Sequence, residues 1–143
     1  MEEPKITLGL IAHNNCKKDM VHLIQAYAHL MKGHHLIATK STGELIRKHT
    51  GLPVILKESG PDGGELQLGG FVASGIIKAV IFLRDPLKRK SHEPDVTALM
   101  RVCDAHNIPL ATNRATAACV LHTVLFHPDK LEDMPPKESD DDP

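Results

Sequence analysis

The chain has 143 residues, of which 17 are Lys or Arg, 18 are Asp or Glu and 10 are His. This length suits one domain, and a composition of 41% hydrophobic and 24% charged residues indicates a globular protein rather than a disordered one. The net charge of −1 gives no electrostatic case for nucleic-acid binding, and no apolar run reaches the roughly 20 residues of a membrane span.

Two features bear on the cellular compartment. The first residues, MEEPK, lack the basic and apolar regions of a signal peptide, so we expect a cytoplasmic protein. The three cysteines, Cys16, Cys103 and Cys119, are an odd number and form no CxxC pair. This pattern argues against a disulfide framework and a structural zinc site, and it favours a reducing compartment.

The charge is distributed unevenly along the chain. Residues 128–143 contain seven acidic residues and two lysines, so this segment carries −5 and leaves +4 for residues 1–127. The segment also contains four prolines and no aromatic residue, a composition that buries too little surface to fold. We predict one domain at 1–127 and an acidic, disordered, solvated tail at 128–143. The basic domain suits a small anionic ligand.

The predicted elements alternate between strand and helix. Residues 6–12 (ITLGLIA) form a continuous apolar run, typical of a strand that is covered on both faces. Residues 19–31 follow with apolar side chains at helical spacing. The further expected elements are a strand at 36–39, a helix with Ser41 or Thr42 as N-cap that ends near Gly51, a strand at 53–57, a helix at 66–76, a strand at 78–83, a helix at 94–103, a strand at 108–112 and a helix at 115–125. Five alternations without hairpin signals predict a single α/β domain with a doubly wound parallel sheet of about five strands and helices on both faces.

Polar loops follow every predicted strand. They lie at residues 13–17, 39–43, 59–65, 84–86 with 91–95, and 112–116. In doubly wound folds the carboxyl ends of the strands meet at one edge of the sheet, and ligands bind there. We therefore expect the functional side chains in these loops.

Two loops and one lysine indicate an anion site. Residues 39–43 place hydroxyl and backbone N–H groups at a helix N-terminus, Lys17 supplies a positive charge, and Ser59-Gly60 adds a hydroxyl and a close backbone approach. For one loop alone, helix capping and a solvated lysine would be the better interpretation. Convergence on one edge favours the anion site. The chain has neither GxxxxGK[ST] nor GxGxxG after its first strand, so nucleoside triphosphate hydrolysis and dinucleotide binding have no support.

Titratable residues in the same loops suggest acid–base chemistry. Glu65 follows a Gly-Gly turn, while His92 and Asp95 bracket a proline turn. A carboxylate base beside an imidazole is the pairing that enolisation needs, and His13 is a candidate second donor. The alternatives are that Glu65 is exposed and that Asp95 only caps a helix. A metal site is not predicted, because no histidine pair at i, i+4 supports one.

Several segments together resemble one known family over about residues 5–125. They are Ala12-His13, Cys16-Lys17, Ala38-Thr39, Ser41-Thr42-Gly43, Ser59-Gly60-Pro61, Gly63-Gly64, Asp85-Pro86-Leu87 and His92 with Pro94-Asp95-Val96. This combination is similar to the methylglyoxal synthase family, within the methylglyoxal synthase-like domain superfamily. The resemblance implies a lyase that converts dihydroxyacetone phosphate to methylglyoxal and inorganic phosphate, with no metal or organic cofactor. It also implies a homohexamer. Because the loops at 39–42 and 59–60 suit an anion, we expect inorganic phosphate to inhibit the protein.

The resemblance assigns roles to individual residues. It implies that a carboxylate at the position of Glu65 takes a proton from the hydroxymethyl carbon, after which phosphate leaves by elimination. His13 and His92 would contact substrate oxygens, and Asp95 would support His92 as an auxiliary acid. The implied phosphate-binding residues are Lys17, Thr39, Ser41, Thr42, Ser59 and Gly60. We also expect Lys40, in the same loop, to add a positive charge beside the phosphate.

The chain departs from the family pattern at three positions. Glu65 and Asn14 stand where the family has aspartates, and Lys40 replaces a glycine of the phosphate loop. The extra methylene of glutamate moves the base, and misplacement near 1 Å costs about 100-fold in rate. Two rival functions therefore stay open: a non-catalytic module that senses a phosphorylated metabolite, and a related phosphate-eliminating lyase that acts on another sugar phosphate.

Overall fold

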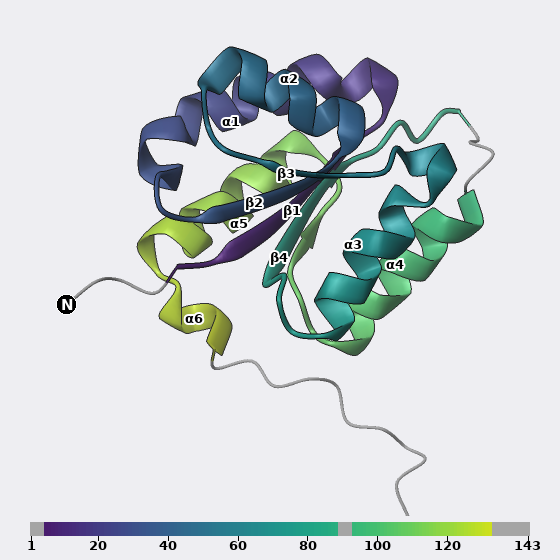
Figure 1. Ribbon diagram of the computed structural model, residues 1–143. Coiled ribbons are helices and arrows are strands. Elements are labelled where there is room, and N and C mark those ends of the chain that lie inside the picture. The colour runs from purple at the N-terminus through teal and green to yellow at the C-terminus, as the bar shows by residue number, and fades with distance from the viewer. Residues whose placement is uncertain (1–4, 89–92, 133–143) are drawn as a thin grey trace, which may run out of the picture.

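The computed structural model describes residues 5–88 and 93–132. Its five strands form one parallel sheet in the order β3-β2-β1-β4-β5 (Figure 1). In chain order they are β1 (Thr7–Ala12), β2 (His35–Thr39), β3 (Ile55–Lys57), β4 (Ala79–Leu83) and β5 (Leu110–Ala111). The predicted single α/β domain with a five-stranded parallel sheet is confirmed.

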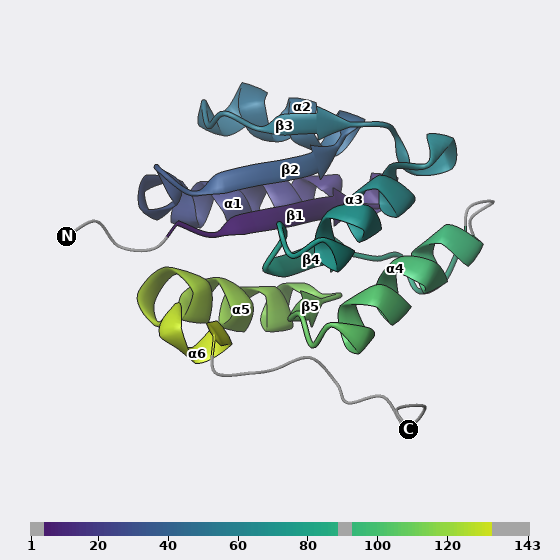
Figure 2. The ribbon, with the colours of Figure 1, turned by 60° about the horizontal axis from the view of Figure 1, so that its bottom comes forward.

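Helices cover both faces of the sheet (Figures 1 and 2). On one face lie α1 (Lys17–Met31), α2 (Lys40–Thr50) and α5 (Arg114–Phe126), and on the other lie α3 (Gly64–Ala73) and α4 (Glu93–Ala105). The short helices are η1 (Asn14–Cys16), η2 (Gly60–Asp62) and α6 (Asp129–Glu132). No helix within residues 5–88 and 93–132 is both long and apolar enough to cross a membrane.

Both faces of the central strands are buried, which explains the continuous apolar runs in the sequence. In β1, Leu8 and Leu10 pack into the core beneath α1, α2 and α5, whereas Ile11 packs into the core beneath α3 and α4. Successive side chains of a strand point to opposite faces, so a strand between two helix layers needs apolar residues at every position. This central position gives β1 and β4 little freedom to move, and their carboxyl ends carry part of the candidate site.

The start of α2 differs from the prediction. The helix begins at Lys40 with Thr39 as N-cap, so neither Ser41 nor Thr42 caps it. Thr39 is also the last residue of β2, and the chain therefore passes from strand to helix without a loop. Gly51 ends the helix in the left-handed region at φ +73°, as the sequence suggested.

The predicted boundary of the acidic tail at residue 128 also needs correction. Asp129–Glu132 form α6, and Leu131 packs against the same core as α1 and α5. Through Leu131, the short helix α6 packs against α5 and the core. The composition of residues 128–143 does not reveal this contact. Residues 133–143 lie outside the described part of the chain.

Candidate active site

A pocket of about 340 Å³ opens at the carboxyl ends of β1 and β2. Residues 59–61, in the loop after β3, form a further wall of this pocket. The pocket is lined by Ile11, Ala12, His13, Asn14, Lys17, Thr39, Ser41, Ser59, Gly60, Pro61 and Glu65. The prediction that polar loops from different strands meet at one edge is therefore confirmed for the loops that follow β1, β2 and β3.

One wall of the pocket is cationic. Lys17, the first residue of α1, donates hydrogen bonds from Nζ to Asn14 Oδ1 at 2.7 Å and to Ser41 Oγ at 2.6 Å. Both acceptors are uncharged, so they orient the ammonium group without neutralising it. Partial burial lowers the pKa of Lys17 from its usual value, because desolvation disfavours the charged form.

The N-terminus of α2 lies beside this ammonium group. Ser41 is the second residue of the helix, and within the described chain the Thr39 side chain makes no capping hydrogen bond to the first turn. Thr39 Oγ1 instead donates to Thr42 Oγ1, which donates to the Ala12 carbonyl oxygen, both at 3.5 Å. A lysine at the positive end of a helix dipole is repulsive unless an anion lies between them. This arrangement therefore favours an anion as the ligand between Lys17 and the start of α2.

Glu65 supplies the carboxylate of the pocket. It lies in the first turn of α3 and is only 1% exposed, so the alternative that Glu65 is an exposed side chain is wrong. Gly63, at φ +96°, turns the chain into the helix. At Gly64 the backbone comes so close to the Glu58 carbonyl oxygen and the Thr39 methyl group that a Cβ would overlap both. The two glycines thus bring the start of α3 against the end of β2, and Glu65 enters the pocket wall.

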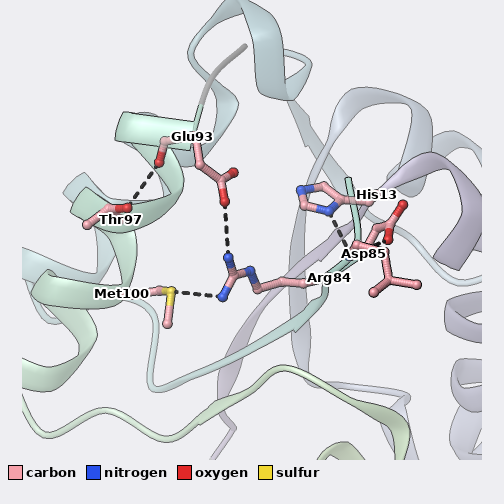
Figure 3. A network of polar contacts seen from close by, with 7 residues as sticks. His13, Arg84, Asp85, Glu93, Thr97 and Met100 are labelled. Atoms are coloured by element: carbon pink, nitrogen blue, oxygen red, sulfur yellow. Dashed lines mark hydrogen bonds and ion pairs between the residues drawn. The ribbon is translucent and has the colours of Figure 1, made fainter. Parts of the chain in front are cut away.

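His13 lies at the end of β1 and is held in a defined orientation (Figure 3). Its backbone N–H donates to the Leu83 carbonyl oxygen at 3.1 Å, and its ring meets Phe82 edge to face with centroids 5.2 Å apart. The ring nitrogen Nδ1 accepts a hydrogen bond from the backbone N–H of Asp85 at 2.9 Å. The imidazole is therefore buried, oriented and part of the pocket wall.

The residues after β4 support this side of the pocket (Figure 3). Asp85 accepts hydrogen bonds from Asn15 Nδ2 at 2.8 Å and from the Leu87 backbone N–H at 3.0 Å. Arg84 pairs with Glu93 at 3.2 Å and contacts the Met100 sulfur at 3.5 Å, so the end of β4 is tied to the start of α4. Sequence reasoning gave no role to Asn15 or Asp85, although the Asp85-Pro86-Leu87 segment after the strand predicted at 78–83 was a signal.

Of four other candidate residues, three are not part of the pocket lining and one is outside the described residues. His92 is outside the described residues. Asp95, half-buried in the first turn of α4, is not part of the pocket lining, and neither are the exposed Lys40 and the buried Thr42. The exposed Asp62 accepts a hydrogen bond from Ser59 Oγ at 2.9 Å. Within residues 5–88 and 93–132, no group of three or more His, Cys, Asp or Glu side chains is placed to hold a metal ion.

Comparisons with known proteins agree on one family. Residues 19–112 match the family model described as MGS-like domain. The chain is 51% identical to the methylglyoxal synthase of Natranaerobius thermophilus over 118 residues, which cover 82% of this chain and 98% of the relative. It is 48% identical to the methylglyoxal synthase of Bacillus subtilis over 117 residues, which cover 82% of this chain and 85% of the relative. The crystal structure of methylglyoxal synthase from Elizabethkingia anophelis matches with a TM-score of 0.76 and 41% identity, covering 82% of this chain and 77% of that one.

Proposed function

The chain belongs to the methylglyoxal synthase family, and from that premise we propose that it converts dihydroxyacetone phosphate to methylglyoxal and inorganic phosphate. It is a phosphate-eliminating lyase. One observation carries the assignment of the site: a fully buried carboxylate, Glu65, and an anion site around Lys17 open into the same pocket. A reaction that removes a proton from one carbon and phosphate from another needs both groups within the length of one small molecule.

The phosphate group of the substrate would bind on the cationic wall. Lys17 supplies a charge that Asn14 and Ser41 leave unneutralised, and the first turn of α2 supplies backbone N–H groups. Ser59 and Gly60 line the facing loop. Electrostatic stabilisation of this kind grows in a pocket from which the ligand excludes water.

Proton abstraction would take place at Glu65. The carboxylate takes a proton from the hydroxymethyl carbon, the C–H electron pair forms a carbon–carbon double bond, and the carbonyl oxygen becomes an enediolate oxygen. His13, which lines the pocket, would donate a hydrogen bond to that oxygen. The hydroxyl proton on the deprotonated carbon then passes to the enediolate oxygen, and that carbon becomes an aldehyde. The carbon–carbon double bond shifts to the phosphate-bearing carbon, whose C–O bond breaks with both electrons leaving on the phosphate oxygen. The resulting enol gains a proton at its terminal carbon, loses the proton of its hydroxyl group and becomes methylglyoxal.

Four further properties are part of the proposal, by resemblance to the family. His92 contacts a substrate oxygen with Asp95 as its support, inorganic phosphate is product and inhibitor, the active form is a homohexamer, and the protein works in the cytoplasm. No metal or organic cofactor takes part in the proposed steps, which use only the acid–base and electrostatic groups described above.

A turnover assay tests the proposal. Purified protein is mixed with dihydroxyacetone phosphate, and methylglyoxal and inorganic phosphate are both quantified; equal amounts of the two are expected. In deuterium oxide, recovered substrate is examined for deuterium at the hydroxymethyl carbon. Substrate binding with neither product nor deuterium uptake would identify a sensing module. Turnover of another sugar phosphate in preference to dihydroxyacetone phosphate would identify the related lyase.

A further inference from the structure

We infer that the backbone N–H of Asp85 holds His13 as a neutral imidazole with its proton on Nε2, and that Asp85 and Asn15 are positioning residues for this tautomer. The inference deepens the proposed function, since it defines His13 as a hydrogen-bond donor to the substrate rather than as a base. It concerns a protonation state that is measurable in the protein without substrate.

The contact at Nδ1 decides the tautomer. A ring nitrogen that accepts an N–H cannot carry a proton itself, so in the neutral ring the proton lies on Nε2. The donor is 2.9 Å away and both residues are buried, so water does not replace the contact. Protonation of Nδ1 would set two N–H groups against each other in a buried site, which disfavours the imidazolium form.

Two further contacts restrict rotation of the His13 ring away from the Asp85 N–H. The His13 backbone is hydrogen-bonded to Leu83 at the end of β4, and the edge-to-face contact with Phe82 sets the plane of the imidazole at 84° to the phenyl ring. Because β1 and β4 are paired in register up to Ala12 and Leu83, His13 and the residues after Leu83 are brought together by the sheet itself.

The Asp85 carboxylate does not accept a hydrogen bond from His13 Nδ1, as a carboxylate beside a histidine commonly does. In a catalytic triad the carboxylate accepts Nδ1–H, and this makes Nε2 a base. Here the two carboxylate oxygens accept from Asn15 Nδ2 and from the Leu87 N–H, and the main-chain N–H of Asp85 is presented to Nδ1 instead. Compared with a catalytic triad, Asp85 donates to Nδ1 instead of accepting from it, so the ring proton lies on Nε2 and Nε2 is a hydrogen-bond donor.

Side chains on both sides anchor the peptide unit that carries this N–H, the one between Arg84 and Asp85 (Figure 3). Arg84 is held by Glu93 and Met100, while Asp85 is held by Asn15. A neutral donor stabilises the developing enediolate oxygen without giving up its proton, so it needs no reprotonation in the cycle.

Nitrogen-15 NMR of the full chain labelled at histidine tests the inference directly at neutral pH. The signals of His13 are identified as those lost in His13→Gln. We expect a protonated Nε2 and an unprotonated Nδ1. A proton on Nδ1, whether in the other neutral tautomer or in an imidazolium ring, would overturn the inference. This measurement does not involve turnover, so a failed turnover assay and a failed tautomer assignment are distinguishable.

The variant Asn15→Ala tests the positioning role. Loss of the amide frees the Asp85 carboxylate, and we expect kcat to fall by about tenfold, inside the roughly 100-fold that misplacement by 1 Å costs. KM should change little, and the His13 nitrogen signals should move toward a mixture of tautomers. Gln25→Ala on α1, which removes an exposed amide hydrogen bond to the His49 carbonyl oxygen of α2, is the matched control and should leave all three readouts unchanged. A lower kcat with unchanged His13 signals would show that Asn15 acts by another route and would refute its assigned role.

Discussion

The two sides of the pocket are built in different ways. The proposed phosphate side, which consists of Asn14, Lys17 and Ser41, is partly exposed and depends on a long flexible side chain. The proposed reaction side consists of His13 and Glu65, with Asp85 hydrogen-bonded to His13 outside the pocket lining; these three residues are buried, with exposed fractions of 6%, 1% and 6%. In the proposed function, the pocket therefore combines an adjustable binding surface with a rigid reacting one.

Distance dependence explains the difference. Attraction between an ammonium group and a phosphate dianion falls slowly with separation, so the lysine tolerates small displacements. Proton transfer requires hydrogen-bond distance between the base and its carbon acid, and a hydrogen bond to a developing oxyanion requires a defined direction. The following variants perturb each side separately, and changes on the reaction side should have the larger effects.

Removal of the base should have the largest effect. Glu65→Gln keeps the size of the side chain but abolishes its basic oxygen, so we expect kcat to fall by about 10²–10⁴-fold with KM little changed. Steady-state kinetics check this, with the exposed Glu44→Gln on α2 as control. Glu65→Asp keeps the chemistry and should retain or raise activity. If Glu65→Gln kept more than roughly a tenth of the parent rate, well above that scale, Glu65 would not be the base.

The second largest effect is expected from a substitution at Gly64, where the backbone lies against Glu58 and Thr39. In Gly64→Ala the new methyl group meets the Glu58 carbonyl oxygen and Thr39, so the start of α3 must shift and Glu65 with it. We expect a loss of about 1–3 kcal/mol in the free energy of unfolding and a fall in kcat of up to about 100-fold. Urea unfolding and kinetics measure the two effects.

Gly70→Ala is the matched control for this variant. It lies in the same helix, and a methyl group there meets no atom within 4 Å. Since alanine favours helix more than glycine does by roughly 0.8–1.0 kcal/mol, Gly70→Ala should be neutral or stabilising. Equal losses of stability in both variants would contradict the role assigned to the Gly64 contact.

Substitutions on the phosphate side should lower the affinity for phosphate rather than the rate of the chemical step. Lys17→Met removes the ammonium group, and because hydrogen bonds to charged groups contribute about 1.5–3 kcal/mol, we expect phosphate affinity to fall by about 10–100-fold. Phosphate should raise the melting temperature of the parent protein, since ligand that binds only the folded state stabilises it. This shift should shrink in Lys17→Met and persist in Lys18→Met, which changes the exposed neighbouring lysine. An undiminished shift in Lys17→Met would exclude the anion site.

The smallest effect concerns pH. Burial lowers the pKa of Lys17, so the ammonium group loses its proton, and the site its charge, at a pH below the usual lysine value of 10.5. Phosphate affinity should therefore decrease as the pH rises toward that value. Lys17→Arg stays protonated throughout this range and should not show the decrease. Calorimetric titration with phosphate across the range measures both proteins, and parallel profiles would contradict the assignment.

Much of this protein is determined locally by its sequence. Apolar runs at strand length, helical spacing between them and polar loops after each strand predict the parallel sheet, because a strand covered on both faces has no polar position. The same pattern predicts that residues 13–17, 39–43 and 59–65 share one edge, since parallel strands end on the same side. Glu65, His13, Lys17 and Ser41 were identified in this way, and the pocket contains all four.

Only the tertiary structure decided how these side chains are held. Asn15 and Asp85 are 70 residues apart, and they meet because β1 and β4 are neighbours in the order β3-β2-β1-β4-β5, which periodicity does not specify. The same adjacency brings the Asp85 N–H to His13 Nδ1, so the choice of tautomer is a property of strand order. Leu131 likewise joins the core through a contact between elements, whereas composition alone placed it in a solvated tail. Local patterns determine elements, and contacts between distant segments determine orientation, because each such contact depends on which elements the fold makes neighbours.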